Sequence, residues 1–332
     1  MENQSVLVIG AGSWGTALAL VLARNQHRVD LWDLSSDHIT DLQQARSNER
    51  YLPGIAFPDN LNPVSDLSAY QDINSVVLAM PCAGLQGALA LLQKYISLPE
   101  LQICLACKGF EPGSNSLNSE VVKNVLGINS VAVLSGPSFA KEVAEELPTA
   151  ITIASHNVDT ARHFSSLFHN ELFRIYTNDD VVGVQVGGAV KNVIAIAAGI
   201  ADGLGYGANT RSALITRSLA EIMRLGIAMG GRQETFMGLA GLGDLILTCT
   251  DDQSRNRRFG LALALGKSPD EAKKEIGQAI EGLVTAAIVQ ELAMRYEIEM
   301  PITEQVNNVL LSRCSPREAV QNLLAREPKA EM

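Results

Sequence analysis

Lys191 is the residue whose setting most strongly suggests chemistry. It is the only charged side chain between Gly183 and Ile200, in a run made largely of glycine, alanine and aliphatic residues. A helix that is apolar nearly all round is expected in a protein interior, where lost hydration favours a neutral lysine and allows proton exchange near neutral pH. Such a lysine suits interconversion of a carbonyl and an alcohol, because the reacting oxygen needs a proton donor and acceptor. The alternative is a lysine whose ammonium group reaches water along its apolar stem.

A second pattern with a chemical meaning is Gly10-Ala-Gly12-Ser-Trp-Gly15, which fits GxGxxG. It follows an apolar run at residues 6–9 and opens a helical pattern at 14–24. The glycines permit a tight turn and the close approach of a pyrophosphate, which then binds the free amides of a helix N-terminus. This context predicts dinucleotide binding; the alternative is a glycine-rich turn without a ligand.

Asp33 ends the next apolar run, where an acidic residue hydrogen-bonds the ribose hydroxyls and disfavours a 2′-phosphate. This position favours NAD(H). Two alternatives stay open: Asp33 is a helix N-cap or a solvated loop residue, or the nearby Arg28, Arg46 and Arg50 provide for the 2′-phosphate of NADP(H).

Two further groups follow predicted strands. Lys108 comes directly after the apolar run at 101–107, and Ser135-Gly136-Pro-Ser138 comes after the next run. Ligands of doubly wound sheets bind beyond the carboxyl ends of the strands, so both groups have a suitable place. The alternatives are an ordinary surface lysine and a simple turn with an N-cap.

The segment Ser254-Arg255-Asn256-Arg-Arg258 is a basic site in an acidic chain. Ser254 is expected to cap the helix that follows, and a phosphate there would meet helix N-terminal amides together with a guanidinium group. A solvated helix face is the alternative. Asp244 could orient or tune a lysine, but the sequence shows no partner for it and favours a structural role.

The cysteines indicate no metal and no disulfide framework. They number five, at 82, 104, 107, 249 and 314, and the pair at 104 and 107 fits CxxC. A redox CxxC needs its first cysteine at a helix N-terminus, whereas this pair lies in a strand-like run. No second CxxC or histidine pair completes a zinc site. We therefore expect buried structural cysteines.

These residues need a scaffold, and the order of elements suggests one. Predicted strands and helices alternate in the first half, which is typical of βαβ units and a parallel sheet with helices on both faces. The second half shows helical patterns only, and Pro269, Pro301 and Pro316 each stand where a helix would begin. We predict an α/β protein: a Rossmann-type doubly wound sheet that binds a dinucleotide over residues 1–184, and an all-α substrate-binding domain over 185–332. The strands are expected at 6–9, 29–32, 76–79, 103–107, 131–134 and 150–154, and the helices at 14–24, 85–95, 117–126, 138–146, 184–199, 209–229, 256–265, 269–276, 284–296, 302–311 and 316–324.

Length and charge limit the class of protein. The chain has 332 residues, which suggests two domains, and a formal net charge of -10, which argues against a general nucleic-acid or anionic-membrane binder. Two uncharged runs, 3–23 and 74–93, are long enough to span a bilayer, but glycines and Pro81 interrupt them, so each is better explained as strand, turn and helix. The N-terminus lacks the positive start of a signal peptide. We expect a cytoplasmic protein without stable membrane insertion.

The motifs together resemble those of bacterial NAD(P)-dependent glycerol-3-phosphate dehydrogenases along nearly the whole chain. The matching stretches are GAGSWGTALA, the CKG that contains Lys108, SGPSFAKE, GGAVKNVIAIAAGIADGLGYGANTR and GLAGLGDLILTCTDDQSRNRRFG. The resemblance implies reversible reduction of dihydroxyacetone phosphate to sn-glycerol 3-phosphate, a precursor of membrane phospholipids. It also implies a Rossmann domain, a helical C-terminal domain and a homodimer.

The resemblance further implies residue roles. By motif match Lys191 is the catalytic acid and base, and Arg255 holds the substrate phosphate close to the cofactor. The expected substrate-binding residues are Lys108, Gly136, Ser138, Lys191, Asp244, Ser254, Arg255 and Asn256. The expected residues for NAD(H) or NADP(H) are Gly10, Gly12, Ser13, Trp14, Gly15, Asp33, Lys108, Ala140, Arg255, Ala279 and Glu281.

One departure and two rivals accompany this interpretation. Family members often carry a basic or imidazole residue just after the second strand, whereas this chain has Asp33-Leu34, which does not support a preference for NADPH. A 3-hydroxyacid or ketopantoate-type reductase would share the two-domain plan and the lysine, but would bind a carboxylate. A dinucleotide sensor would keep the glycines without needing Lys191.

Overall fold

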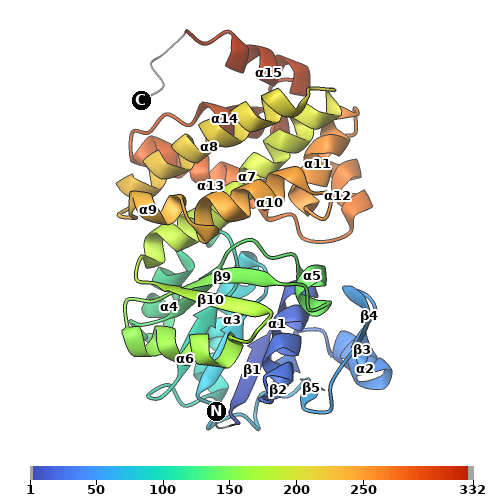
Figure 1. Ribbon diagram of the computed structural model, residues 1–332, viewed down its shortest axis with the longest axis vertical. Coiled ribbons are helices and arrows are strands. Elements are labelled where there is room, and N and C mark those ends of the chain that lie inside the picture. The colour runs from blue at the N-terminus through green and yellow to red at the C-terminus, as the bar shows by residue number, and fades with distance from the viewer. Residues whose placement is uncertain (1–2, 328–332) are drawn as a thin grey trace. The chain divides into compact units, whose positions relative to one another are not determined.

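The chain divides between Gln185 and Val186 into two units, and each is described by itself. The computed structural model describes residues 3–327. The division falls inside helix α7 (Val181–Gly203), the long helix that carries Lys191 (Figure 1). The assignment of dinucleotide binding to the first unit and substrate binding to the second stays a prediction.

The first unit is built on an eight-stranded sheet with the order β10-β9-β8-β7-β6-β1-β2-β5. β1 pairs in parallel with β2 on one side and β6 on the other, so it is an interior strand of the sheet. β8 and β9 are antiparallel, so the sheet is mixed and not parallel throughout as predicted. The strands are β1 (Ser5–Ile9), β2 (Arg28–Trp32), β5 (Leu61–Val64), β6 (Ser75–Leu78), β7 (Gln102–Leu105), β8 (Ala132–Ser135), β9 (Thr149–Ala154) and β10 (Phe173–Asn178).

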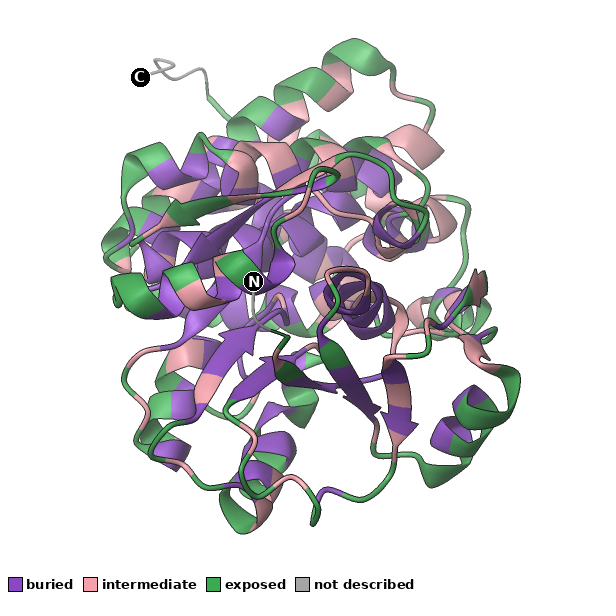
Figure 2. Ribbon diagram, turned by 60° about the horizontal axis from the view of Figure 1, so that its bottom comes forward, coloured by how far each residue is buried: buried purple, intermediate pink, exposed green. Residues whose placement is uncertain are grey.

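The central strands form because their side chains are apolar on both faces. Val6, Val8, Val76 and Val77 are fully buried, and Figure 2 shows these strands almost entirely in the colour of buried residues. The six predicted strands are confirmed to within two residues at each end. The helices of this unit are α1 (Ser13–Arg24), α2 (Ser36–Ala45), the short η1 (Cys82–Gly84), α3 (Leu85–Tyr95), α4 (Asn118–Leu126), α5 (Ala140–Ala144) and α6 (Val158–Phe168), and β3 (Ser47–Asn48) pairs with β4 (Leu52–Ala56).

Some elements of this unit escaped prediction. α2 is largely exposed and polar, and β10, at the sheet edge, is buried only at Phe173. A search for continuous apolar runs finds strands buried on both faces and misses elements of this kind.

The second unit is helical throughout its described residues, which confirms the prediction of an all-α second domain. After α7 come α8 (Ala208–Ala228), α9 (Gln233–Phe236), a π-helical turn η2 (Leu239–Gly243), α10 (Asp244–Thr250), α11 (Arg255–Ala264), α12 (Pro269–Ile276), α13 (Glu281–Arg295), α14 (Pro301–Leu310) and α15 (Pro316–Leu324). α9, η2 and α10 had no counterpart in the prediction, because the stretch is short and rich in glycine.

Helix α7 is long and apolar enough to cross a membrane by length and composition. However, 89% of its most hydrophobic 18-residue window is buried inside the protein. Its apolar side chains therefore serve as a core around which other helices of the second unit pack.

Helices α7 and α11 approach each other unusually closely. A Cβ atom added at Gly199 would lie 1.9 Å from the carbonyl oxygen of Arg257, and one added at Gly260 would lie 2.0 Å from that of Ile196. Two helix backbones can meet at this distance only where glycine removes the side chain. The contact fixes α11 against the helix that carries Lys191.

We predict that Gly199→Ala lowers the free energy of unfolding by about 3 kcal/mol, because a methyl group has to push two helix backbones apart. Urea unfolding followed by circular dichroism measures this. Gly87→Ala is the matched control, since an added Cβ in that α3 position meets nothing within 4 Å. That control should be neutral or stabilising by up to about 1 kcal/mol. Equal stability of Gly199→Ala and the wild type would show that the helices are not in close contact.

Candidate active site

The glycine-rich turn joins β1 to α1 and admits only glycine at two positions. Gly10 has φ +107°, and a Cβ there would lie 2.8 Å from the backbone nitrogen of Met80. A Cβ at Gly15 would lie 1.8 Å from the carbonyl oxygen of Gly10. At Gly12, in contrast, an added Cβ meets nothing within 4 Å. The turn is therefore closed toward the sheet and open on the side of the helix N-terminus.

The N-terminus of α1 is suited to an anion. Gly12 is the N-cap and makes no side-chain capping hydrogen bond, so the first amides of the helix are left for another acceptor. Ser13 Oγ donates to the carbonyl of Tyr51 (2.7 Å), and Trp14 Nε1 donates to that of Ala106 (3.2 Å). These two side chains tie the turn to its neighbours. The open side and the uncapped amides fit the pyrophosphate of a dinucleotide.

Asp33 lies next to this turn. One carboxylate oxygen accepts the Ala11 N–H at 2.9 Å, and the other accepts the Ser35 N–H at 3.1 Å. The N-cap of α2 is Ser35, whose hydroxyl accepts the His38 N–H. The interpretation of Asp33 as an N-cap is therefore wrong.

Lys108, Gly136 and Ser138 lie together at the ends of β7 and β8. Lys108 Nζ donates to the Gly136 carbonyl at 2.9 Å, and Ser138 Oγ donates to the same oxygen at 3.1 Å. Gly136 has φ +149°, and a Cβ there would lie 3.1 Å from Ile151 Cα, so a side chain would strain the turn. Ala140 begins the short helix α5 directly afterwards.

In the second unit, Lys191 is only 7% exposed and has specific partners. Its Nζ donates to Asp244 Oδ1 at 2.5 Å and to Thr248 Oγ1 at 2.9 Å. Asp244 and Thr248 are one helical turn apart on α10, and Thr248 donates back to the Asp244 carbonyl at 2.6 Å. The interpretation of Lys191 as a lysine that reaches water is wrong. Asp244, for which the sequence offered no partner, compensates the charge of the buried ammonium group.

A chain of amide contacts runs beside this ion pair. Asn256 Nδ2 donates to Asn192 Oδ1 at 3.0 Å, and Asn256 Oδ1 accepts the Gly282 N–H at 3.0 Å. These bonds join α7, α11 and the first turn of α13. Asn192 follows Lys191 in sequence, so Asn256 binds α7 at the residue next to Lys191.

The basic segment begins α11 as predicted, and its arginines have different roles. Ser254 caps the helix through its hydroxyl, which accepts the Arg257 N–H at 3.2 Å. Arg257 is buried and paired with Asp202 at 2.6 Å and with Asp252, so it serves the structure. Arg258 is exposed.

Arg255 makes weaker contacts than Arg257 does. Its Nη1 makes one long hydrogen bond, 3.4 Å to Gln278 Oε1. Burial lowers the pKa of Arg255, while the negative charge of Glu281 raises it. Arginine nevertheless stays protonated at neutral pH. A charged, partly buried guanidinium at a helix N-terminus is an arrangement suited to a phosphate group. Ala279 lies beside Gln278 in the same connection between α12 and α13.

Three residues of these clusters were missed from sequence: Asn192, Thr248 and Gln278. Asn192 is adjacent to Lys191. Thr248 is four residues after Asp244, and this spacing places the side chains of Asp244 and Thr248 on one face of α10. That spacing was a usable signal. Gln278 reaches Arg255 from another segment, and no local pattern marks it.

Other features of the structure lie outside these clusters. Among residues 3–327 no group of three or more histidine, cysteine, aspartate or glutamate side chains is arranged to hold a metal ion. The five cysteines are unbonded to one another, and Cys104 and Cys107 are buried. Burial raises the pKa of the Cys249 thiol to about 12.

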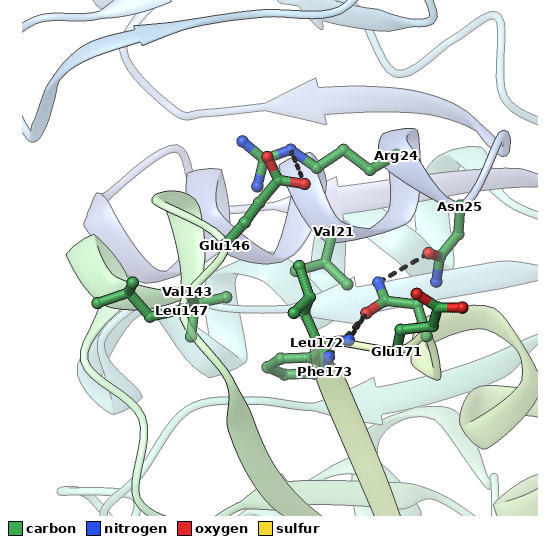
Figure 3. Close-up of a pocket in the computed structure, with 10 residues that line it drawn as sticks. Val21, Arg24, Asn25, Val143, Glu146, Leu147, Glu171, Leu172 and Phe173 are labelled. Atoms are coloured by element: carbon green, nitrogen blue, oxygen red, sulfur yellow. Dashed lines mark hydrogen bonds and ion pairs between the residues drawn. The ribbon is translucent and has the colours of Figure 1, made fainter.

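A pocket lies beside the C-terminal end of α1, at the opposite end of that helix from the glycine-rich turn (Figure 3). Arg24 and Glu146 form an ion pair across it, and Asn170 donates to Asn25 at 2.9 Å. No predicted site residue lines this pocket. Its lining residues are Val21, Arg24, Asn25, Val143, Glu146, Leu147, Asn170, Glu171, Leu172 and Phe173.

A turn open to a pyrophosphate in the first unit, and a buried lysine paired with an aspartate in a helical second unit, are consistent with the class of nicotinamide-dependent dehydrogenases. Family models make the class specific: the N-terminal model of NAD-dependent glycerol-3-phosphate dehydrogenase matches residues 5–161, and the C-terminal model matches residues 180–321. The chain belongs to this family.

Individual relatives agree with the family assignment. A glycerol-3-phosphate dehydrogenase [NAD(P)+] of Nitrosococcus oceani is 51% identical over 332 residues, with 99% of this chain and 96% of the relative covered. The crystal structure of glycerol-3-phosphate dehydrogenase from Coxiella burnetii superposes with a TM-score of 0.95 at 47% identity, covering 98% of this chain and 99% of that one. A ketopantoate reductase from Ralstonia eutropha has a TM-score of 0.61 at 14% identity, covering 95% and 99% of the two chains; this likeness shows the fold alone.

We predict that Asp244→Asn lowers the free energy of unfolding by about 3 kcal/mol, because it leaves the buried ammonium of Lys191 without an opposite charge. Lys191→Met in the Asp244→Asn background should recover most of this loss, since no charge is then buried. Thermal and urea unfolding of the two single variants and the double variant measure the coupling.

The control for this cycle is Glu275→Gln, which breaks the exposed ion pair with Lys267. It should change the free energy of unfolding by less than about 1 kcal/mol. A cost for Asp244→Asn no larger than that of the control would contradict a buried, structurally required ion pair.

Proposed function

We propose that this chain catalyses the reversible, NAD(P)H-dependent reduction of dihydroxyacetone phosphate to sn-glycerol 3-phosphate. The observation that carries the proposal is the buried Lys191, whose amino group is held by Asp244 and Thr248, on the helix that Asn256 binds through Asn192. The identity of the substrate is inferred from the family, and the chemistry of these side chains is suited to a phosphorylated ketone.

The first unit holds the dinucleotide in this proposal. The uncapped amides of α1 bind the pyrophosphate, and Asp33 receives the adenosine ribose. Ser13, Trp14, Ala140, Arg255, Ala279 and Glu281 complete the contacts that the family resemblance implies. When bound, the reduced nicotinamide supplies a hydride for the C2 carbonyl carbon of the substrate.

Lys191 supplies the proton. As the carbonyl becomes an alkoxide, the ammonium of Lys191 lies ready to donate a proton to the oxygen, and in the reverse direction the neutral amine accepts it. Asp244 and Thr248 hold Nζ from one side, which fixes its direction before the reaction begins. A preformed positive charge at a developing oxyanion, in a site closed to water, is among the strongest forms of transition-state stabilisation.

The phosphate of the substrate is anchored at α11. Arg255 contributes a charged fork, the capped helix start contributes backbone amides, and Asn256 links this anchor to Asn192 beside the lysine. Lys108, Gly136 and Ser138 are the proposed contacts from the first unit. Holding the phosphate sets the distance from it to C2 and converts binding energy into orientation.

The setting in the cell follows from the product. sn-Glycerol 3-phosphate is a precursor of membrane phospholipids, so the enzyme would feed glycerophospholipid synthesis. We propose that it acts in the cytoplasm as a homodimer, without nucleic-acid partners or stable membrane insertion.

Lys191→Ala should lower kcat by at least about 100-fold while the Kd of the nucleotide changes little, because the proton donor is lost and the glycine-rich turn is untouched. Loss of reduced-nicotinamide absorbance with dihydroxyacetone phosphate measures turnover, and fluorescence titration measures nucleotide binding. Reduction at a near-normal rate would remove Lys191 from the catalytic role.

Arg255→Ala should raise the KM for dihydroxyacetone phosphate by about 100-fold, the value of a lost charge-assisted pair. Arg258→Ala is the control, because this exposed arginine belongs to the same basic segment. It should leave the KM within about twofold of the wild type. An unchanged KM for Arg255→Ala, or equal effects of the two substitutions, would exclude Arg255 as the phosphate ligand.

The same assay separates the rival functions. Turnover of dihydroxyacetone phosphate with either nucleotide supports the proposal. Turnover of 2-keto or 3-keto carboxylates in its place would indicate the hydroxyacid or ketopantoate-type reductase. Nucleotide binding without turnover of any of these substrates would indicate a sensor.

A further inference from the structure

We propose that this chain selects NAD(H) over NADP(H), and that Asp33 is the residue that decides. The inference rests on the proposed function, because it concerns the same dinucleotide. It goes further by assigning the preference to one carboxylate whose position is fixed before the nucleotide binds.

Asp33 is held by the backbone on both sides. Its two oxygens accept N–H groups from Ala11, within the glycine-rich turn, and from Ser35, at the start of α2. A rotation of the carboxylate away from the turn would break a 2.9 Å hydrogen bond and leave the Ala11 amide, which is buried, without it. The side chain therefore cannot make room for a bulky anion at low cost.

The glycine-rich turn and helix α2, which lie on the two sides of the Asp33 carboxylate, are also hydrogen-bonded to their surroundings. The Ala11 carbonyl accepts hydrogen bonds from His38 Nε2 at 3.1 Å and Asn48 Nδ2 at 2.9 Å, and both donors are buried. His38 lies in α2, so the turn, the end of β2 and the start of α2 form one connected piece. A shift of α2 to accommodate a 2′-phosphate would disturb all of these bonds.

Each of the three arginines that the sequence left available makes a contact of its own in the structure. Arg46 donates to the carbonyls of Leu61 and Pro58, at 2.9 and 2.7 Å. Arg28 is at the opposite end of β2, about 16 Å of extended chain from Asp33, and pairs with Asp30.

The third arginine, Arg50, lies over the ring of Tyr51, with 5.0 Å between its guanidinium carbon and the ring centroid. The residues next to Asp33 offer no cation either: Leu34 is 83% exposed, and Asp37 adds a second acid in the first turn of α2.

The difference between the two nucleotides at the adenosine ribose then determines which one binds more tightly. The vicinal hydroxyls of NAD(H) are donors that a fixed carboxylate can accept. A 2′-phosphate removes one of these donors and places up to two negative charges beside Asp33 and Asp37. Like charges in contact cost several kcal/mol without a compensating cation, so discrimination of at least about tenfold is expected.

The test measures binding without turnover, by isothermal titration calorimetry with ADP-ribose and 2′-phospho-ADP-ribose. The wild type should bind ADP-ribose at least about tenfold more tightly. Leu34→Arg, at an exposed position that folding does not need, should tighten binding of the 2′-phosphate about tenfold and leave ADP-ribose nearly unchanged. Asp33→Asn should reduce the ratio of the Kd for 2′-phospho-ADP-ribose to the Kd for ADP-ribose by at least about fivefold.

Asp37→Asn is the matched control, because it removes the same charge from the same segment. It should reduce the ratio less than Asp33→Asn does. Equal or tighter binding of 2′-phospho-ADP-ribose by the wild type, or equal effects of the two aspartate variants, would overturn the assignment to Asp33. Binding of neither probe would overturn dinucleotide binding itself, and with it the proposed function; binding with the wrong preference overturns only this inference.

Discussion

A lysine placed inside an apolar helix needs an opposite charge, and much of the second unit is arranged to meet this requirement. Lys191 lies on α7, and α10 places Asp244 2.5 Å from its ammonium group. α10 ends shortly before α11, whose N-terminus carries Arg255. The close contact between α7 and α11 at Gly199 and Gly260 then sets α11 against the helix of the lysine. One buried charge thus links Lys191, its partner Asp244 and the start of α11 in a single packed unit.

In the first unit, the corresponding constraint is that a turn must leave backbone amides free. Gly10 and Gly15 allow β1 and α1 to meet so closely that a side chain at either position would collide with the backbone. The helix that follows has no side-chain cap, so its N-terminal partial charge is available to a ligand. The side chains around the turn, from Ser13 to Asp33, are mostly bonded to the backbone and hold the turn in this form.

The chain is acidic overall, yet it has to bind a phosphorylated substrate and a dinucleotide. It does so with local groups and not with a basic surface. Of the arginines in its basic segment, Arg257 is used inside the helical unit, where Asp202 balances its charge, and Arg255 is left at the helix start. Around Asp33, Arg46 likewise binds backbone carbonyls and Arg28 pairs with Asp30, and the proposal on nucleotide choice rests on this distribution of charge.

The sequence by itself determined the fold class, the glycine-rich turn, the capped start of α11 and the burial of Lys191 in an apolar helix, because each depends on local patterns: hydrophobic periodicity, glycine spacing, an N-cap serine and a lone charge in an apolar run. It could not determine that Asp244 and Thr248 hold Lys191, that β9 reverses direction beside β8, or that Asp33 is bonded to Ala11. Nor could it tell that Arg257, and not Arg255, pairs with Asp202. Residues 53 positions apart, as Lys191 and Asp244 are, carry no mark of their pairing. Only the packing of helices and strands brings such groups within hydrogen-bonding distance, and packing depends on the whole chain.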